Sequence, residues 1–507
     1  MARTSQTALI VALAVPSFMV GIDFTGAMLL VLPVAREFGA DISTTQWILN
    51  AYALAVGMVV VAGGRLADMY GRRRAHLVGL ALLFIGSLAC AAAPSIGALI
   101  AARMVQGAGI ALVVPATMAI GTTSVAVSAR GLIVGSMLGA IAIGNVVAPF
   151  LSGASLALGD WRYLFAFNAL LAAASVVAAL VVLADDRPAG VRERVDLAGM
   201  VSAGLALFAL LYALDIGSDA GWLAPQVLAW WAIAAGAAVA FVVLEHRVRQ
   251  PMLPPVTMRN GQFLAALVLQ GLPATAFFAI LMYVPRLFEM TRGWSVDKAL
   301  LAVVPCLAAL ALTNSTAGRF FNTLGPRALS LTGHTLVTVA MAGLALAMPG
   351  APLGVVIAAI TVATFGAGLI FGPMATGAVN AEAPERAGLV GGLNFVAHLT
   401  VGAVGIALAT ALITVFARAR LPGALEAAGV TLTPHDLAAL ARYSAGSGDL
   451  ARVLPHVSAD HAAALQRAAG TAYASGLGAA FFLCAALAFI GVVLSAFLDD
   501  RRLGRVA

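Results

Sequence analysis

Two charged residues, Asp23 and Arg103, stand deep inside long apolar stretches of the sequence. On membrane-insertion scales a charge at the centre of a membrane helix costs about 2.5 to 3.5 kcal/mol, so a charge at such a position usually has a function. A buried aspartate beside an arginine is a group whose protonation depends on its surroundings. We therefore interpret Asp23 as a proton-carrying residue and Arg103 as the charge that modulates it. The alternative is a static salt bridge that only holds two helices together.

A third candidate is the short turn at residues 63–74, which reads G-G-R-L-A-D-M-Y-G-R-R-R and lies between two apolar runs. Arginines in a short loop between membrane helices favour the cytoplasmic side. This rule accounts for Arg72 and Arg73. It does not explain why positions 64 and 71 are glycine and position 68 is aspartate, that is, Gly64, Gly71 and Asp68.

The composition of the 507 residues excludes a soluble globular protein. Hydrophobic residues make up 62% of the chain and charged residues only 10%, whereas soluble domains carry about 25% charged residues. Apolar stretches of roughly 18–25 residues recur, each long enough to cross the membrane as a helix. We expect about fourteen such helices, from one near residues 9–33 to one near 471–497. The first is expected to remain in place and not to be cleaved as a signal peptide. The expected fold class is an all-α polytopic membrane protein.

Several kinds of chemistry find no support in the sequence. Cys90, Cys306 and Cys484 lie inside apolar runs and have no spacing for pairing or metal binding. We find no phosphate-binding loop, zinc-ligand set or group of nucleophile and base. The formal charge of +7 comes from arginines in loops, so it does not predict nucleic-acid binding. We expect no enzyme activity, no cofactor and no metal.

The loop charges predict that both termini are cytoplasmic. With the N-terminus inside, eighteen Lys and Arg residues fall on the cytoplasmic side and five in the short outer loops. Positive residues concentrate in short cytoplasmic loops, so this difference determines the orientation. Residues 417–470 then form a long extracytoplasmic loop.

The turn has a second copy. Residues 318–327 repeat the pattern of residues 64–73 at a constant spacing, with Asn322 in place of Asp68 and one arginine fewer. Both copies would lie on the cytoplasmic side, which indicates two parallel halves related by an axis along the membrane normal. The expected division is listed in chain order: a six-helix bundle at 1–186, two inserted helices at 187–260, and a second six-helix bundle at 261–507.

Three short motifs lie in the first half of the chain. The first is Gly64-x-Leu66-Ala67-Asp68-x-x-Gly71-Arg72-Arg73. It resembles the cytoplasmic loop motif of the major facilitator superfamily, although Met69 stands where a basic residue is usual. The second is Leu99-x-x-x-Arg103-x-x-Gln106-Gly107-x-Gly109, similar to the fourth-helix motif. The third is Gly144-x-x-x-Ala148-Pro149-x-x-Ser152-Gly153, similar to the fifth-helix antiporter motif with two glycines replaced.

Further stretches resemble the fourteen-helix drug:proton antiporter branch of this superfamily. They are Asp23-x-Thr25, Trp161-Arg162-Tyr163-x-Phe165-x-x-Asn168 and the residues from Arg386 to Ala407, where His398 occupies a position that is commonly arginine. The resemblance implies two six-helix bundles plus two inserted helices. It also implies that Asp68 latches the cytoplasmic side closed by accepting hydrogen bonds from helix N-termini or arginines of the other half.

The same resemblance implies that the fifth helix, with Gly144, Pro149 and Gly153, forms a tight seal that limits proton leak. Small residues permit close helix contact and proline permits a bend. Generic packing of small residues is the alternative.

Polar side chains inside apolar runs are the candidates for a substrate cavity. We select Asn145, Asn394 and His398, because Asn145 lies one turn before Pro149 and the charge of a histidine can switch near neutral pH. Such residues are more often satisfied hydrogen bonders between helices, which applies equally to Asn314, Asn380 and His334. Since Asp23 is the one acid that is clearly deep, the expected substrates are neutral, zwitterionic or monocationic amphiphiles.

The expected function is secondary active transport, in which amphiphilic drugs or small molecules leave by proton-coupled antiport and alternating access. The expected location is the cytoplasmic (inner) membrane of a bacterium. The partners would be the substrate, protons and the lipid bilayer, with no nucleic acid, and the protein would be monomeric. A specific lipid or metabolite exporter or importer on the same fold, and a non-transporting membrane scaffold or sensor, are the open alternatives.

Overall fold

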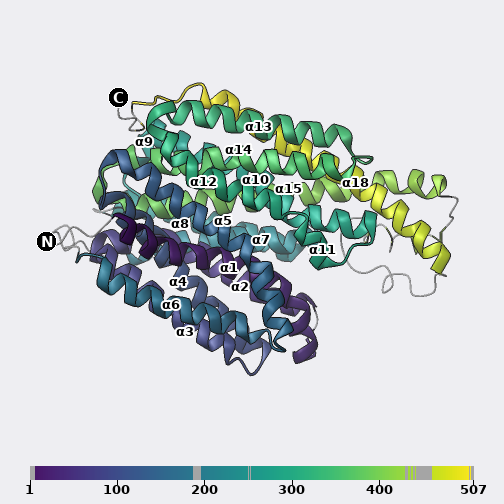
Figure 1. Ribbon diagram of the computed structural model, residues 1–507, viewed down its shortest axis with the longest axis horizontal. Helices are drawn as coiled ribbons and strands as arrows, with labels where there is room; N and C mark the ends of the chain where they lie inside the picture. The colour runs from purple at the N-terminus through teal and green to yellow at the C-terminus, as the bar shows by residue number, and fades with distance from the viewer. Residues whose placement is uncertain are drawn as a thin grey trace.

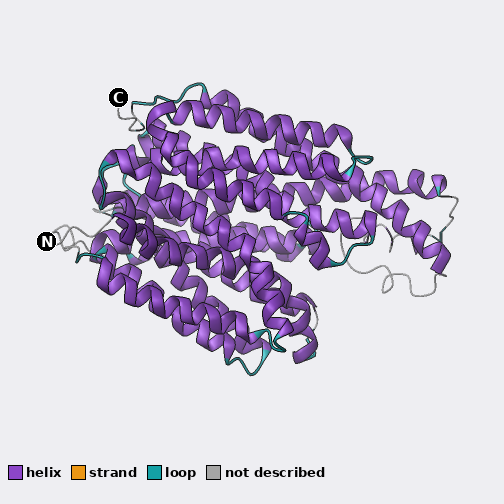
Figure 2. Cartoon of the chain, viewed as in Figure 1, coloured by secondary structure: helices purple, strands orange, loops and turns teal. Residues whose placement is uncertain are grey.

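A computed structural model describes residues 6–40, 42–185, 196–248, 253–428 and 459–501, together with residues 251, 432, 433, 436, 437, 440, 443 and 503. These residues form helices and connecting loops, and no β-strand occurs among them (Figure 2). Fourteen helices in this part of the chain are long and apolar enough to cross a membrane, which confirms the number expected from hydropathy. The predicted end of the first bundle at residue 186 lies outside the described residues.

The first six membrane helices are α1 (Gln6–Phe38), α2 (Ile42–Tyr70), α3 (Arg72–Ala91), α4 (Ile96–Thr123), α5 (Val127–Ala157) and α6 (Arg162–Val182). The two that follow are α7 (Leu197–Ala220) and α8 (Pro225–Arg247). The last six are α10 (Gly261–Arg292), α12 (Val304–Leu324), α13 (Pro326–Ala347), α14 (Leu353–Asn380), α15 (Ala387–Ala427) and α18 (Ala459–Ser495). Short helices between them are α9 (Pro255–Arg259), α11 (Val296–Leu301) and η1 (Pro384–Arg386).

Some helices extend beyond the apolar runs that predict them. Helix α15 continues to Ala427 and α18 begins at Ala459, so both ends of the predicted loop 417–470 are helical, and most of residues 429–458 lie outside the described ones. Hydropathy marks only the part of a helix inside hydrocarbon, whereas its backbone hydrogen bonds can continue beyond it. A span predicted near 297–317 is divided into α11 and α12, because Pro305 at the start of α12 has no N–H to continue the preceding turn.

The membrane helices form two groups that lie side by side (Figure 1). In the first group α1 packs on α5 and α6, and α4 packs on α2 and α3. In the second, α14 packs on α12 and α13, and α18 packs on α13 and α15. The groups meet where α2 packs on α15 and α5 packs on α12, while α7 packs on α2 and on its partner α8. Helix α1 begins and α18 ends at the same end of the molecule, which we call the termini end (Figure 1).

The sequence repeat places glycines at two matching helix crossings. A Cβ atom on Gly64 of α2 would overlap the carbonyl oxygen of Gly388 on α15. A Cβ atom on Gly318 of α12, which the repeat aligns with Gly64, would overlap the carbonyl oxygen of Gly131 on α5. The two groups therefore approach to backbone contact at both crossings, as small residues allow in membrane bundles.

The turns that follow these crossings also match. Gly71 follows α2 with a φ of 104°, and the aligned Gly325 follows α12 with a φ of 84°. Residues with a side chain rarely adopt these angles, so glycine is required at both positions. Each turn can then lead directly into the next helix.

Candidate functional site

Asp23 of α1 and Arg103 of α4 form a buried ion pair, with exposed fractions of 1% and 0%. Nη1 of Arg103 lies 3.6 Å from Oδ1 of Asp23, and Nη2 donates a hydrogen bond of 3.2 Å to the carbonyl oxygen of Asp23. Oδ1 also accepts a hydrogen bond of 2.6 Å from Asn168 on α6. Among the described residues, Oδ2 of Asp23 has no hydrogen-bond partner. The structure thus brings the two predicted residues together and leaves one carboxylate oxygen unpaired.

Neighbouring polar groups hold the Arg103 guanidinium in place. Its Nε donates a hydrogen bond of 2.8 Å to the carbonyl oxygen of Ile48 on α2, and its Nη1 donates one of 2.8 Å to Oε1 of Gln106. Gln106 in turn donates a hydrogen bond of 2.8 Å to Ser87 on α3. The fixed fork of guanidinium donors can serve several acceptors at once, which an ammonium cannot do with the same geometry.

Sequence reasoning assigned no role to Asn168 or Gln106, although both stand in the quoted motifs. A signal for Gln106 exists, because it lies three residues after Arg103 and therefore on the same face of α4. No comparable signal exists for Asn168, since it reaches Asp23 from a different helix.

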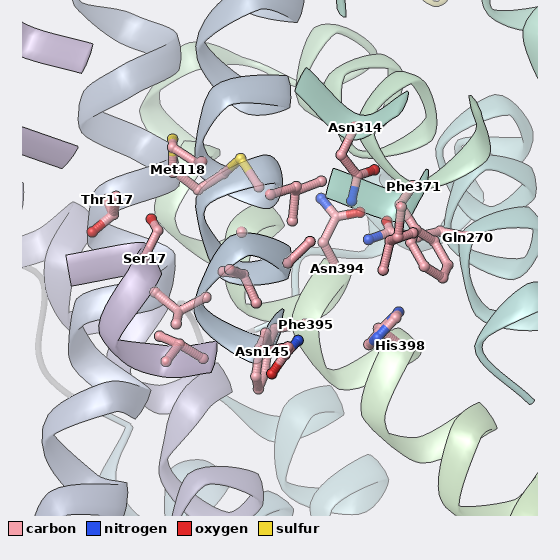
Figure 3. A pocket seen from close by; sticks show the side chains of 18 of the residues that line it. Ser17, Thr117, Met118, Asn145, Gln270, Asn314, Phe371, Asn394, Phe395 and His398 are labelled. Atoms are coloured by element: carbon pink, nitrogen blue, oxygen red, sulfur yellow. The ribbon is translucent and has the colours of Figure 1, made fainter. Parts of the chain in front are cut away.

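A cavity lies between the two helix groups (Figure 3). It has about 860 Å³ of empty space, including the part open to solvent, and its lining is mostly apolar. The amide and imidazole side chains that line it are Asn145, Gln270, Asn314, Asn394 and His398. An adjoining pocket shares Asn145 and His398 and extends to Tyr52. In the part of the chain that the structure describes, no Asp, Glu, Lys or Arg lines either pocket.

The three residues predicted to face the cavity all line it. His398 lies among aromatic rings, with its ring centroid 4.7 Å from that of Phe371 and 5.4 Å from that of Phe278. Asn145 of α5 accepts a hydrogen bond from Thr25 of α1, and Asn394 of α15 points into the space between the groups (Figure 3).

The other polar residues inside apolar runs divide between two roles. Asn314 lines the cavity, and so does Gln270, which sequence reasoning did not select. Asn380 instead accepts a hydrogen bond of 2.8 Å from Arg130 at the termini end, and Nδ1 of His334 lies 2.9 Å from the carbonyl oxygen of Ser330 one turn earlier. Sequence alone cannot separate these roles, because each residue is a single polar side chain in an apolar run.

The ion pair and the cavity are adjacent but separate. Neither Asp23 nor Arg103 lines the cavity or the adjoining pocket. Tyr52 lines the adjoining pocket and also contacts the ion pair, because its ring centroid lies 4.2 Å from the guanidinium carbon of Arg103. A second link comes from Thr25, two residues after Asp23, which donates a hydrogen bond of 2.8 Å to Oδ1 of Asn145. A displacement of α1 at Asp23 would therefore move a residue of the cavity wall.

At the termini end, Asp68 caps the N-terminus of α15. Its Oδ1 accepts a hydrogen bond of 2.9 Å from the Gly388 N–H, and its Oδ2 accepts one of 2.9 Å from the Leu389 N–H. The first N–H groups of a helix have no partner within it and carry a positive partial charge, so a carboxylate is favourable there. Arg72 lies 3.1 Å from Oδ1 of Asp68 and donates a hydrogen bond of 2.5 Å to the Pro384 carbonyl oxygen of the other group.

The predicted contact of Asp68 with a helix N-terminus is thus present, and the arginine beside it comes from its own turn. Arg73 stays within the first group, where it pairs with Asp185 and donates a hydrogen bond of 2.9 Å to the Leu180 carbonyl oxygen.

At the second turn the contact has the opposite polarity. Nδ2 of Asn322, which the repeat aligns with Asp68, donates a hydrogen bond of 2.8 Å to the carbonyl oxygen of Ser128 in the first turn of α5. A carboxylate cannot donate a hydrogen bond, so an amide suits this position and an aspartate does not. The departure of Asn322 from the first copy of the turn therefore has a physical reason.

The three residues of the fifth-helix motif do not share one environment. A Cβ atom on Gly144 would overlap the carbonyl oxygen of Phe18, so α5 and α1 are in close contact there. Helix α5 continues through Pro149 without interruption. Gly153 is exposed, and an added Cβ would meet no atom within 4 Å. Close packing thus accounts for glycine at position 144 and not at position 153.

Residues 13–406 match the family model described as Major Facilitator Superfamily. The chain is 30% identical to the puromycin resistance protein pur8 of Streptomyces alboniger, with 89% of this chain and 91% of that protein covered. It is 27% identical to the multidrug resistance protein Stp of Mycobacterium tuberculosis, with 84% of this chain and 79% of that protein covered.

A third relative is the tetracenomycin C resistance and export protein of Streptomyces glaucescens, which is 26% identical with 96% of this chain and 90% of that protein covered. Among solved structures, the human organic anion transporter MFSD10 (TETRAN) matches with a TM-score of 0.60 and 16% identity, over 97% of this chain and 99% of that one. The proton:xylose symporter XylE matches with a TM-score of 0.62 and 13% identity, over 99% of this chain and 97% of that one. At these identities the two structures indicate a shared fold alone.

Proposed function

This chain belongs to the major facilitator superfamily, and on that basis we propose that it exports small amphiphilic molecules in exchange for protons. The protein is a membrane transporter and not an enzyme, because the family and the proteins that it matches are transporters. Three of these relatives are named for resistance to several drugs or to one antibiotic. Resistance of this kind follows when a toxic compound is removed from the cell, so the names favour export by this chain.

The observation that carries the proposal is a sealed ion pair beside an uncharged cavity. Asp23 and Arg103 lie outside the cavity lining, yet Thr25 joins α1, the helix of Asp23, to Asn145 in the cavity wall. A transporter that exchanges protons for substrates needs a titratable group whose charge state alters the substrate site. The Asp23–Arg103 pair can act as such a group, because the hydrogen bond from Thr25 to Asn145 connects the helix of Asp23 to the cavity wall.

Coupling then proceeds through the charge of Asp23. When a proton binds its free Oδ2, the carboxyl becomes neutral and its attraction to Arg103 is lost. Helix α1 can then shift against α4 and α5, and the hydrogen bond from Thr25 to Asn145 transmits this shift to the cavity. Substrate and proton thus favour different arrangements of the same helices, which is the condition for exchange.

Gating uses the contacts between the two halves, residues 1–186 and 261–507, which rock about the cavity with the inserted helices 187–260 at the side. The bonds from Gly388 and Leu389 to Asp68 close the termini end, and they must break and re-form in each cycle. We place the termini end in the cytoplasm, loop 417–470 outside, and the protein as a monomer in the inner membrane of a bacterium, since the relatives named above are bacterial.

Transport by purified protein in liposomes tests the proposal. The vesicles enclose a pH-sensitive dye, and puromycin, for which one relative is named, is added under an imposed pH gradient. We expect puromycin to dissipate the gradient in vesicles that contain the wild-type protein and not in empty vesicles. Puromycin movement that proceeds at the same rate without a gradient, and moves no protons, would overturn the proposal.

A further inference from the structure

The cavity wall contributed by the second helix group contains three carboxamide side chains. They are Gln270 of α10, Asn314 of α12 and Asn394 of α15, with exposed fractions of 4%, 3% and 2%. Figure 3 shows them pointing toward one another and into the cavity, with His398 beside them. Three helices distant in sequence thus direct one kind of functional group at one place.

Polar atoms in this cluster have no partner in the described part of the chain. These atoms are Oε1 of Gln270, Oδ1 of Asn314, and both Oδ1 and Nδ2 of Asn394. Nearly all buried polar groups in folded proteins are hydrogen-bonded, because removing such a group from water without a partner is unfavourable. Several unpaired amide atoms at one cavity wall are therefore available to a ligand that supplies the missing partners.

The chemistry of the wall defines that ligand. A carboxamide offers an acceptor and donors, and it carries no net charge. No charged side chain lines the cavity among the described residues, and Asp23 lies outside the lining. A permanent cation would lose its hydration without gaining a counter-charge, which is strongly unfavourable in an apolar site. The wall thus matches a neutral group that both donates and accepts hydrogen bonds.

The remaining wall is aromatic and apolar. Phe277 and Phe371 lie on the same side of the cavity as the carboxamides, with ring centroids 6.3 Å apart in an edge-to-face arrangement. Phe395 lies on α15, one residue after Asn394. Aromatic faces favour flat conjugated molecules, which they contact by stacking or by edge-to-face packing.

We propose that Gln270, Asn314 and Asn394 form a recognition site for neutral, flat conjugated molecules that carry carbonyl groups together with N–H or hydroxyl groups. This inference rests on the proposed function, since it names the substrate class of the same cavity. It adds a selectivity: the site discriminates against permanent cations of the same size and shape.

Two fluorescent probes of nearly equal shape test the proposal. Acridone is a neutral tricyclic molecule with a ring carbonyl and a ring N–H, and 10-methylacridinium has the same three rings with a permanent positive charge. Binding of each to the purified full-length protein in detergent is measured by fluorescence anisotropy. We expect the wild-type protein to bind acridone at least about tenfold more tightly than 10-methylacridinium, since loss of one or two hydrogen bonds has this effect.

Three variants remove one carboxamide each while keeping a side chain of similar size: Gln270→Leu, Asn314→Leu and Asn394→Leu. We expect each to weaken acridone binding by about three- to tenfold. The matched control is Gln226→Leu, which removes an exposed carboxamide on α8 that does not line the cavity, and it should leave acridone binding unchanged. A fourth variant, Asn394→Asp, introduces a counter-charge and should strengthen 10-methylacridinium binding above that of the wild type.

The outcomes separate this inference from the proposed function. Absence of acridone binding, equal or tighter binding of the cation by the wild type, or acridone binding that all three leucine variants leave unchanged would each overturn the inference. If one of these results were accompanied by proton exchange driven by a cationic substrate, the inference would be wrong and the proposed function would still be supported. Conversely, acridone binding with the expected losses and no proton exchange in liposomes would support the inference and contradict the proposed coupling.

Discussion

Asp68 and Gly388 lie in different helix groups and are joined by a hydrogen bond of 2.9 Å from the Gly388 N–H to the Asp68 carboxylate. The bond forms where the backbones of α2 and α15 are in contact, because Gly64 and Gly388 leave no side chain between them. A carboxylate, a helix N-terminus and two glycines therefore act together at this point. The carboxylate and the close glycine contact can be changed separately, and the expected results differ.

The charge of Asp68 is the first of these features. Asp68→Asn keeps the size of the side chain and removes its negative charge, so it weakens the hydrogen bonds to the α15 N-terminus, which contribute roughly 1.5–3 kcal/mol when one partner is charged. We expect transport in liposomes to slow by about tenfold and acridone affinity to stay within about twofold of the wild type. A normal transport rate in Asp68→Asn would contradict the role of Asp68 in gating, and lost acridone binding would place Asp68 at the substrate site instead.

Close approach of the helices is the second feature. In Gly64→Ala the added methyl group overlaps the Gly388 carbonyl oxygen, so the termini end cannot close fully. We expect transport to be lost, and a cysteine-reactive probe to reach engineered cysteines near residue 388 more readily. The control is Gly236→Ala on α8, where an added Cβ meets no atom within 4 Å and transport should be unchanged. Normal transport by Gly64→Ala would show that closure does not require this contact.

In the second turn the side chain of Asn322 donates a hydrogen bond, whereas Asp68 in the first turn accepts one. Asn322 donates to the Ser128 carbonyl oxygen, so Asn322→Asp replaces a hydrogen bond with two oxygens facing each other. We expect the free energy of unfolding to fall by about 1 kcal/mol, measured by thermal unfolding in detergent, because the bond is exposed to solvent. Asn322→Ala should be less destabilising than Asn322→Asp. Greater stability of Asn322→Asp would mean that the side chain accepts a hydrogen bond instead.

We expect that lysine cannot replace Arg103. It donates to Ile48 and Gln106 while its guanidinium lies beside Asp23, and a lysine ammonium cannot reach all three from one atom. In Arg103→Lys we expect proton exchange to fall at least about tenfold, with the protein still monodisperse by size-exclusion chromatography. Full exchange by Arg103→Lys would show that a positive charge alone is sufficient at this position.

Features that depend on patterns extending over many residues, such as apolar runs and the repeat, can be predicted from the sequence. Apolar runs gave the fourteen membrane helices, because each run had to cross the hydrocarbon, although α15 and α18 extend past their runs. The cost of isolated charges in a membrane selected Asp23 and Arg103, which the structure places 3.6 Å apart. The repeat aligned Gly64 with Gly318, and both lie at backbone crossings.

The site could be predicted only in part, because its remaining residues are distinguished by packing. Gln270 and Asn314 line the cavity, whereas Asn380 binds Arg130 at the termini end, and nothing in their local sequence separates them. Asn168 could not be assigned to Asp23, since the contact depends on how α6 lies against α1. The polarity of the Asn322 contact likewise depends on which backbone group of α5 faces it.

The central claim is that Asp23 gives up a proton when substrate binds, and proton release by the purified protein measures this directly. Acridone or puromycin is added to the wild-type protein in weakly buffered detergent solution, with a pH-indicator dye recording free protons. We expect release by the wild type and by Glu426→Gln, a control that removes an exposed acid at the end of α15, and no release by Asp23→Asn. Undiminished proton release by an Asp23→Asn protein that still binds substrate would contradict the claim.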